Sequence, residues 1–320
     1  MIEIKNITKE YSLEMGIFRS HTGFIKALDS VNITWKKGET LGVAGETGCG
    51  KTTLAKIITN LIKPSSGQVL LNGKDVASYP RIELAQNIQM IFQDPFSSLN
   101  PRMKIKDIIT EYNVINKKIT KTKQQEEAEY LLKLIGLSKE CVLKYPHELS
   151  GGQRQRVALA RAISVKPRYL ICDEPVSSVD VCIRKQILDL FISLKDVFDM
   201  GYLFISHDLR VLKSISDNII IMYKGRIVER ASKTLIYNEP LHPYTQLLLE
   251  SMPGMVFCQK KEQLSKITDD KNNALESNNE GCPYRNKCLA KKKICRKTLP
   301  ELKEVKKGHF VSCLLFDKAA

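Results

Sequence analysis

The sequence predicts an α/β fold, and three observations support that prediction. Short apolar runs of the kind found in buried strands alternate with segments whose apolar residues recur at helical spacing. A glycine-rich turn lies between one of these runs and one of these segments, as it does in several folds built on parallel strands. Apolar residues make up 43% of the 320-residue chain, enough for a packed core in two domains, or in one domain with an extension.

The elements expected in the first half follow from apolar periodicity. Residues 2–7 and 31–37 alternate apolar and polar side chains, which predicts two half-buried strands. Residues 40–44 form a short apolar run that ends at the glycine-rich turn, and residues 52–62 after that turn have helical spacing. The further elements expected here are strands at 68–71 and 88–92, a hairpin turn at Asn72-Gly73, and helices between about 104 and 145, one of them from Gln124 to Ile135 with Gly136 as its C-terminal cap.

The second half continues the alternation of helices and strands. The expected elements are, in order, a helix at 153–163, a strand at 169–172, a helix at 181–198, a strand at 202–205, and a hairpin of strands at 219–223 and 226–229 around Lys224-Gly225. After about residue 254 the composition changes, and residues 259–281 are polar with few large apolar side chains. This composition predicts a linker before a last segment that holds four cysteines.

The net charge of +15 comes mainly from lysine, with 37 Lys against 13 Arg. Specific readers of phosphates and bases favour arginine, so the excess indicates first a solvated surface, second attraction to a membrane surface, and least of all a nucleic-acid partner. No stretch of about 18 consecutive apolar residues occurs, and the first residues contain no apolar secretory segment. We therefore expect a chain without a membrane span that stays in the cytoplasm.

The strongest single motif is the turn after the 40–44 run. Residues 45–52 read GETGCGKT and fit the pattern G-x-x-x-x-G-K-[ST] in the strand–turn–helix setting that this pattern requires. Glycines let the backbone N–H groups point inward at phosphate oxygens, Lys51 would reach the β- and γ-phosphates, and the Thr52 hydroxyl would ligate Mg²⁺. The alternative is an ordinary glycine-rich turn. The expected nucleotide-binding residues of this loop are Gly45, Glu46, Thr47, Gly48, Cys49, Gly50, Lys51, Thr52 and Thr53.

A second motif supports the phosphate-loop interpretation. The apolar run at 169–172 ends in Asp173-Glu174-Pro175. An acidic residue at the end of a buried strand beside a phosphate loop can hold Mg²⁺, so Asp173 is the expected metal residue. Glu174 is placed to polarise an attacking water as a general base. A surface acidic pair is the alternative, and the apolar strand directly before the pair argues against it.

A third motif carries a family resemblance. The pentapeptide LSGGQ at 149–153, together with the two motifs above, resembles the ATP-binding cassette (ABC) ATPases. The resemblance implies a P-loop NTPase of recA-like fold over residues 1–240, with an antiparallel β-subdomain and a helical subdomain at about 94–155. It also implies that the start of the helix after the pentapeptide contacts the γ-phosphate bound by the other protomer of a head-to-tail dimer. The residues expected in that contact are Ser150, Gly151, Gly152 and Gln153.

Further positions match the family residue by residue. Gln93, in IFQDP, resembles the glutamine that senses Mg²⁺ and the attacking water and touches the membrane partner. His207, in FISHD, resembles the switch histidine that contacts the γ-phosphate, although a lone histidine at a strand end is more often structural. Asp180, in SSVD, resembles the aspartate that communicates across the dimer. The resemblance therefore implies an active ATPase in which Glu174, His207 and Gln93 are catalytic and Gln93 also contacts Mg²⁺.

The adenine-stacking residue is assigned through the same resemblance. Tyr11 resembles the aromatic residue that stacks on the adenine ring in these ATPases. The segment from 12 to 26 separates it from the next expected strand, so Phe18 or Phe24 could take its place. Tyr11 is the residue that we expect in this role.

Four segments resemble a narrower branch of the family. They are residues 16–31, 91–103 and 241–253, and the cysteine arrangement at the C-terminus. All four resemble the ATPases of oligopeptide and dipeptide importers, whose close relatives import nickel, and most of all the second of the two ATPases, usually named F. The resemblance implies that residues 241–320 form the C-terminal extension typical of this branch.

The importer interpretation implies partners and a location. The expected partners are a second ATPase subunit in a heterodimer, two transmembrane permeases, and an extracellular or periplasmic peptide-binding protein, at the cytoplasmic face of the membrane. The alternatives are an importer of nickel or another small solute, a soluble ABC ATPase that acts on DNA or ribosomes, and a regulatory subunit that does not hydrolyse ATP. The last two are disfavoured, because the chain has one cassette without a long coiled-coil insertion and keeps its catalytic positions.

The chain contains nine cysteines, four of them grouped near the C-terminus with the spacing C-x5-C-x6-C-x17-C. Four thiolates suit a [4Fe–4S] cluster or structural zinc, and the tight pair typical of zinc sites is absent. The extension resembles one seen in this importer branch, so a cluster is the first interpretation. Reduced structural thiols and, less favoured in the cytosol, disulfides are the alternatives. The expected ligands are Cys282, Cys288, Cys295 and Cys313. We interpret Cys141, Cys172, Cys182 and Cys258 as packing residues or incidental thiols.

Overall fold

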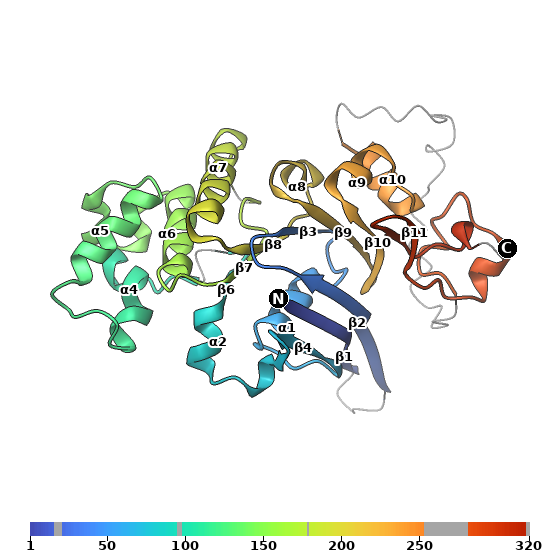
Figure 1. Ribbon diagram of the computed structural model, residues 1–320, viewed down its shortest axis with the longest axis horizontal. Helices are drawn as coiled ribbons and strands as arrows, with labels where there is room; N and C mark the ends of the chain where they lie inside the picture. Colours follow the sequence, from blue (N-terminus) through green and yellow to red (C-terminus); the bar gives the residue numbers. More distant parts are fainter. Residues whose placement is uncertain (16–20, 95–97, 178, 253–280, 318–320) are drawn as a thin grey trace.

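The fold contains a large sheet and a smaller antiparallel sheet (Figure 1). It was obtained as a computed structural model, which describes residues 1–15, 21–94, 98–177, 179–252 and 281–317. Within these residues the large sheet has eight strands in the order β11-β12-β10-β9-β3-β8-β7-β6, and the smaller sheet has four in the order β2-β1-β4-β5. The α/β prediction is confirmed.

The centre of the large sheet is parallel. Its strands are β3 (Thr40–Ala44), β6 (Ile88–Ile91), β7 (Tyr169–Asp173), β8 (Gly201–Ile205) and β9 (Asn218–Tyr223). β3 pairs with β8 and β9, and β7 pairs with β8 and β6, all in parallel register. The strands are apolar almost throughout because both faces of the sheet are covered. Parallel pairing brings their carboxyl ends, and the loops that follow them, to one edge of the sheet.

Two cores lie on opposite faces of this sheet, and strand alternation divides the side chains between them. On β8, Tyr202 and Phe204 pack into one core, whereas Leu203 and Ile205 pack into the other. The first core also contains residues of α6 (Gly151–Ile163), α7 (Val181–Phe198), α8 (Leu209–Ile215) and α9 (Lys233–Asn238). The second contains α1 (Lys51–Ile58), residues of α2 (Arg81–Asn87) and the inner face of the smaller sheet.

The smaller sheet is built from β1 (Ile2–Met15), β2 (His21–Trp35), β4 (Ser66–Leu71) and β5 (Lys74–Asp75). β1 and β2 extend well beyond the strands predicted at 2–7 and 31–37. Their outer halves pair Lys9–Met15 with His21–Leu28, and within that ribbon the aromatic side chain of Phe24 is 70% exposed. Residues 10–12 and 23–26 are exposed without alternation of buried and exposed side chains, so periodicity could not extend the strands.

A helical layer stands at one end of the large sheet (Figure 1). It contains α4 (Ile105–Ile115), α5 (Gln124–Leu134) and two short 3-10 turns, Lys139–Leu143 and Pro146–Glu148, beside α6. Gly136 follows α5 with a φ of +67°, which confirms the predicted C-terminal cap. The guanidinium of Arg156 on α6 donates a hydrogen bond of 3.0 Å to the carbonyl of Ile135 and holds this end of α5 to α6.

The C-terminal part folds back onto the large sheet at the opposite end. It consists of β10 (Arg226–Ser232), α10 (Pro243–Glu250), a 3-10 turn (Lys293–Arg296), β11 (Lys303–Lys306) and β12 (His309–Val311). β12 pairs antiparallel with β10 and so adds the β11–β12 hairpin to the sheet. The linker predicted at 259–281 lies outside the described residues except for Gly281. No helix in the described ranges is long and apolar enough to cross a membrane.

Candidate functional site

The loop between β3 and α1 has a backbone that only glycine can adopt at two positions. Gly50 has a φ of +105°, and a Cβ there would lie 2.4 Å from the carbonyl oxygen of Ala27. Gly45 has a φ of +152°, and a Cβ there would lie 2.3 Å from the carbonyl oxygen of Met222. The loop is therefore packed directly against backbone on both sides, which fixes its course into α1.

Lys51 is the first residue of α1, and its side chain is buried across the loop. Its Nζ donates hydrogen bonds to the carbonyl oxygens of Gly45 and Glu46, at 2.8 and 2.9 Å. A buried ammonium group held over the N-terminus of a helix, among loop N–H groups, forms a site for anionic oxygens.

A cleft of about 460 Å³ opens above this loop. It is lined by the loop itself and by residues that follow other strands of the large sheet. The lining residues are Ala27, Thr47, Gly48, Gly50, Lys51, Thr52, Thr53, Gln93, Glu174, Ser177 and His207. Six predicted loop residues and the three predicted catalytic residues thus line one cleft, whereas Gly45, Glu46 and Cys49 form the loop behind it.

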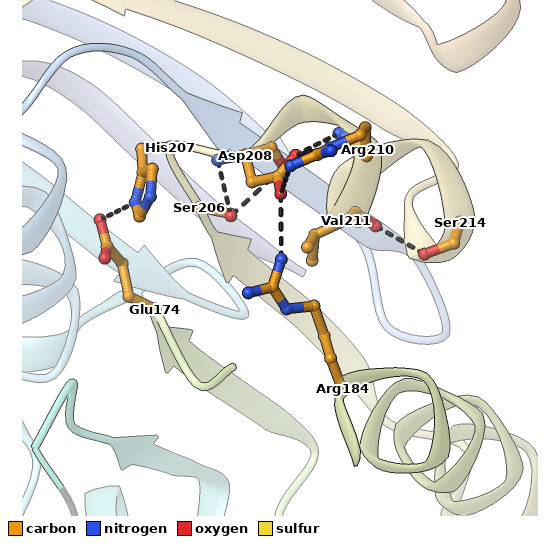
Figure 2. Close-up of polar contacts among 8 residues, drawn as sticks. All are labelled: Glu174, Arg184, Ser206, His207, Asp208, Arg210, Val211 and Ser214. Atoms are coloured by element: carbon orange, nitrogen blue, oxygen red, sulfur yellow. Dashed lines mark hydrogen bonds and ion pairs between the residues drawn. The ribbon is translucent and has the colours of Figure 1, made fainter. Parts of the chain in front are cut away.

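Two polar side chains meet at the Glu174 carboxylate. His207 Nδ1 lies 3.0 Å from Oε1 of Glu174, and Gln93 Nε2 donates to Oε2 at 3.3 Å (Figure 2 shows the Glu174–His207 contact). Glu174, Gln93 and His207 follow β7, β6 and β8, so the parallel sheet brings them together. The backbone of Glu174 has a φ of +48°, an uncommon conformation for a residue other than glycine, and such conformations cluster at functional sites.

Asp173 is the last residue of β7 and is buried behind the cleft. Burial raises the pKa of its carboxyl group, and a hydrogen bond from the Thr52 hydroxyl acts in the opposite direction. Its Oδ1 is buried and finds no hydrogen-bond partner in the described part of the chain. A buried carboxylate oxygen without a donor, beside a hydroxyl group, is the oxygen-rich environment that Mg²⁺ prefers. The residues present therefore fit this ion.

The residue after His207 is held by two arginines (Figure 2). Asp208 accepts hydrogen bonds from Nε and Nη2 of Arg210, at 3.0 and 2.8 Å, and from Nη1 of Arg184 on α7, at 3.2 Å. Burial alone would raise the pKa of Asp208, but the hydrogen bonds and charges of Arg210, together with the charge of Arg184, keep it below its usual value. Asp208 also caps α8, so the backbone that carries His207 is firmly placed.

The residues of the LSGGQ pentapeptide lie away from this cleft, at the N-terminus of α6. The Ser150 hydroxyl accepts from the Gln153 N–H at 3.4 Å, and the Gln153 side chain accepts from the Ser150 N–H at 3.0 Å. This capping box sets the start of the helix. Ser150 and Gly151 are exposed, so the N–H groups of this helix end are open to a second molecule. Asp180, at the start of α7, is also exposed and outside the cleft.

Tyr11 is placed on the outer half of β1, opposite Ile25 on β2. Its ring is 41% exposed, has Lys9 Nζ at 5.1 Å from its centroid, and does not line the cleft. Of the alternatives, Phe24 is exposed on β2, and Phe18 lies outside the described residues. Adenine stacking by Tyr11 therefore stays a prediction.

The four grouped cysteines are free thiols in one region of the C-terminal part. Cys282 and Cys295 are buried, and Cys288 and Cys313 are half-buried. Burial raises the pKa of Cys313 to about 11, and the other three thiols of the group add to this effect, so all four lie within electrostatic range. The Cys282 N–H donates to the Cys295 carbonyl at 2.8 Å.

The spacing of these thiols disfavours a single metal ion. No three His, Cys, Asp or Glu side chains in the described ranges are grouped closely enough to hold one ion. Tetrahedral zinc at about 2.3 Å from each sulfur requires sulfurs about 3.8 Å apart. A [4Fe–4S] cluster binds each thiolate through a different iron and accepts a wider spacing. The described residues therefore show no ready site for a single zinc ion, and the cluster stays a prediction.

Sequence patterns did not identify three residues that lie at or behind the cleft. The Ser177 hydroxyl donates to the Glu174 carbonyl at 3.0 Å, and the serines after Asp173-Glu174-Pro175 were a usable signal for it. Ala27, whose carbonyl oxygen lies against Gly50, gave no signal in the sequence. The Tyr244 hydroxyl accepts a hydrogen bond of 2.9 Å from the Glu46 N–H, a contact between residues 198 positions apart.

Comparison with solved structures gives the same architecture. A dimeric post-hydrolysis state of the ATP-binding cassette MJ0796, bound to ADP and Pi, matches with a TM-score of 0.64 and 27% identity over 73% of this chain and 99% of that one. CbiO1 from Clostridium perfringens, part of an ABC transporter complex, matches with a TM-score of 0.63 and 26% identity over 74% of this chain and 90% of that one. A family model for ABC transporters matches residues 28–177. The fold and the cleft therefore define an ABC ATPase.

The comparisons also place the chain within that class. The oligopeptide transport ATP-binding protein AppF of Bacillus subtilis is 41% identical over 99% of this chain and 97% of its own length. The dipeptide transport ATP-binding protein DppF of Escherichia coli is 37% identical over 99% of this chain and 95% of its own. A family model for the oligopeptide/dipeptide transporter C-terminal region matches residues 228–295. The chain belongs to the ATP-binding subunits of oligopeptide and dipeptide ABC transporters.

Proposed function

We propose that this chain hydrolyses ATP to drive the uptake of oligopeptides or dipeptides through partner permeases. The observation that carries the proposal is the meeting of Lys51, Glu174 and His207 at one cleft along the carboxyl edge of the parallel strands. The peptide cargo is inferred from the relatives, which are named as transport ATP-binding proteins for oligopeptides, dipeptides or di/tripeptides.

The phosphate loop binds the triphosphate of ATP. Lys51 binds the β- and γ-phosphate oxygens, and the N–H groups at the start of α1 bind the same chain of oxygens. Thr52, Asp173 and Gln93 are the residues that would hold Mg²⁺, which neutralises phosphate charge when it is bound. The orphaned Oδ1 of Asp173 supports this assignment.

Glu174 is the general base. Its carboxylate accepts the proton of the attacking water while His207 and Gln93 hold its two oxygens in place. The same two side chains face the γ-phosphate, so movement of either disengages the base. The arginine-bound Asp208 keeps the His207 backbone fixed during this step.

A substitution at Glu174 tests this assignment. Glu174→Gln keeps the size and shape of the side chain but cannot take a proton. We expect hydrolysis to fall at least about a hundredfold, while ATP affinity stays within about threefold of the parent value. Glu83→Gln, at an exposed position of α2, is the control. Hydrolysis by Glu174→Gln at the parental rate would show that another group is the base.

The exposed N-terminus of α6 supports a head-to-tail dimer. The N–H groups after Ser150 face the γ-phosphate bound by a second ATPase subunit, and Asp180 lies on the same interface. The second subunit is a different chain in our proposal, and two permeases and a peptide-binding protein complete the transporter. This assembly places the chain on the cytoplasmic face of the membrane.

Peptide cargo and nickel cargo are separated by a growth and uptake assay. Deletion of the gene should abolish growth on peptides as the amino-acid source and uptake of a labelled tripeptide, and should leave nickel uptake unchanged. Complementation with the parent chain should restore growth, and complementation with Glu174→Gln should not. Loss of nickel uptake with peptide uptake intact would contradict the peptide assignment.

We also propose that the four grouped cysteines bind one [4Fe–4S] cluster with a structural role. Their mutual proximity and half-buried to buried positions support this ligand set. Anaerobic purification should give a brown protein with about four irons and four sulfides per chain, and Cys288→Ser should lower both. Cys141→Ser, at a buried cysteine in the helical layer, is the control. A colourless, iron-free protein that folds and hydrolyses ATP would contradict the cluster.

A further inference from the structure

One peptide unit of the phosphate loop is held from both sides. The carbonyl of Gly45 accepts a hydrogen bond of 2.8 Å from Lys51, and the N–H of the same peptide, which belongs to Glu46, donates to the Tyr244 hydroxyl at 2.9 Å. Because a peptide unit is planar, these two hydrogen bonds set its orientation and the entry into the loop. One partner belongs to the loop itself, and the other comes from α10 in the C-terminal part.

The position of Tyr244 is fixed by its own helix. His242 caps α10, and its Nδ1 accepts a hydrogen bond of 3.0 Å from the Tyr244 N–H. The N–H groups of Leu241 and His242 donate to the carboxylate of Glu229 on β10, at 2.8 and 2.9 Å. The Tyr244 side chain is fully buried. Its hydroxyl therefore reaches the loop from a rigid support.

The ring of Tyr244 belongs to a cluster of three tyrosines. Its centroid is 4.7 Å from that of Tyr223 on β9 and 5.4 Å from that of Tyr284, and these two lie 5.3 Å apart. Tyr284 stands between Cys282 and Cys288 in the sequence and is buried. The cysteine-bearing segment thus contacts, through one ring, the side chain that holds the loop peptide.

We propose that Tyr244 is a positioning residue for the phosphate loop and that the cysteine-bearing segment sets nucleotide affinity through the Tyr284 ring. The proposal rests on the proposed function of the loop as the ATP site. Loss of the Tyr244 hydroxyl leaves the Glu46 N–H, which donates in a partly buried hydrogen bond, without its acceptor, and the loop must reorient to satisfy it. The cost falls on ATP binding, because neither tyrosine touches Glu174 or His207.

The first experiment compares Tyr244→Phe with Tyr202→Phe. Tyr202 is also fully buried, and its hydroxyl donates to the Phe191 carbonyl at 3.0 Å, away from the cleft. We expect Tyr244→Phe to raise KM for ATP and Kd for a fluorescent ATP analogue about three- to tenfold, with kcat within about twofold of the parent. Tyr202→Phe should lower Tm about as much as Tyr244→Phe does, but it should leave KM and Kd unchanged. Equal Kd values for Tyr244→Phe and the parent would overturn the positioning role.

The second experiment compares two changes at Tyr284, whose role requires only the ring. Tyr284→Leu should weaken ATP binding in the same direction as Tyr244→Phe, and Tyr284→Phe should match the parent. Parental affinity in Tyr284→Leu would overturn the link to the cysteine-bearing segment. Failure of the parent chain itself to bind ATP would refute the proposed function, and this inference with it.

Discussion

The carboxylate of Glu229 is the most sensitive point in the attachment of the C-terminal part. It is fully buried, accepts the N–H groups of Leu241 and His242, and contacts His309 Nε2 on β12 at 2.7 Å. One side chain therefore joins β10, the start of α10 and β12. We expect Glu229→Gln, which keeps the size of the side chain, to destabilise the protein.

The size of this effect follows from the contacts. Both carboxylate oxygens of Glu229 accept hydrogen bonds, and an amide offers only one oxygen. At least one buried donor loses its acceptor, which lowers the free energy of unfolding by about 1–3 kcal/mol. The remaining hydrogen bonds are also weakened, because their acceptor no longer carries a charge. A loss of about 3 kcal/mol lowers Tm by about 4–5 °C in a 320-residue chain, for an unfolding entropy of about 2.1 cal/mol/K per residue.

Thermal unfolding followed by circular dichroism measures this change. The matched control is Glu239→Gln. Glu239 follows α9 and forms an exposed ion pair with Lys306 on β11, so it also links the segment before α10 to the β11–β12 hairpin. An exposed pair contributes little, so we expect no measurable shift for the control. A Tm for Glu229→Gln within about 1 °C of the parent value would refute the view that this buried carboxylate holds the C-terminal part.

Two further predictions concern pH and nucleotide binding. Burial lowers the pKa of His242 from 6.5 to about 4, so stability should be complete above about pH 6.5 and fall by about 3 kcal/mol as the pH approaches 4. His242→Asn keeps a capping acceptor but has no group that titrates in this range. In urea titrations at pH 7 and 4.5, the variant should therefore lose much less stability than the parent on acidification. Equal losses of stability in the two proteins would contradict the role of His242. Lys51→Ala removes the cation that partners the phosphates and should weaken ATP binding at least about tenfold by calorimetry, with Lys56→Ala as control; parental affinity would exclude this role.

The part of the site that the sequence predicted is local. The strand at 40–44, the glycine-rich loop and α1 follow one another along the chain, so periodicity and glycine spacing locate all three. Glu174 was found for the same reason, since it directly follows an apolar strand that the sequence makes visible, whereas His207, two residues after the end of β8, was assigned through the family resemblance. Their meeting required only that these strands be parallel neighbours.

The part that the sequence missed depends on contacts between distant segments. β11 is a run of four exposed residues and β12 has three, so neither shows an apolar period. Only the pairing of β12 with β10, and of β11 with β12, makes them strands. The hydrogen bond from the Glu46 N–H to Tyr244 joins residues that no local pattern connects. The same is true of the three-tyrosine cluster, which brings together β9, α10 and the cysteine-bearing segment.

The addition of β12 to the large sheet has a consequence for the nascent chain. His309 lies 80 residues after Glu229, so the edge of β10 is synthesised long before the strand that covers it. At a synthesis rate of 5–20 residues per second, this strand edge and the Glu229 carboxylate stay without their partners for roughly 4–16 s. An uncovered strand edge invites pairing with other chains. Chains truncated before β12 should therefore associate with one another during synthesis, and the last segment acts as the closing step of folding.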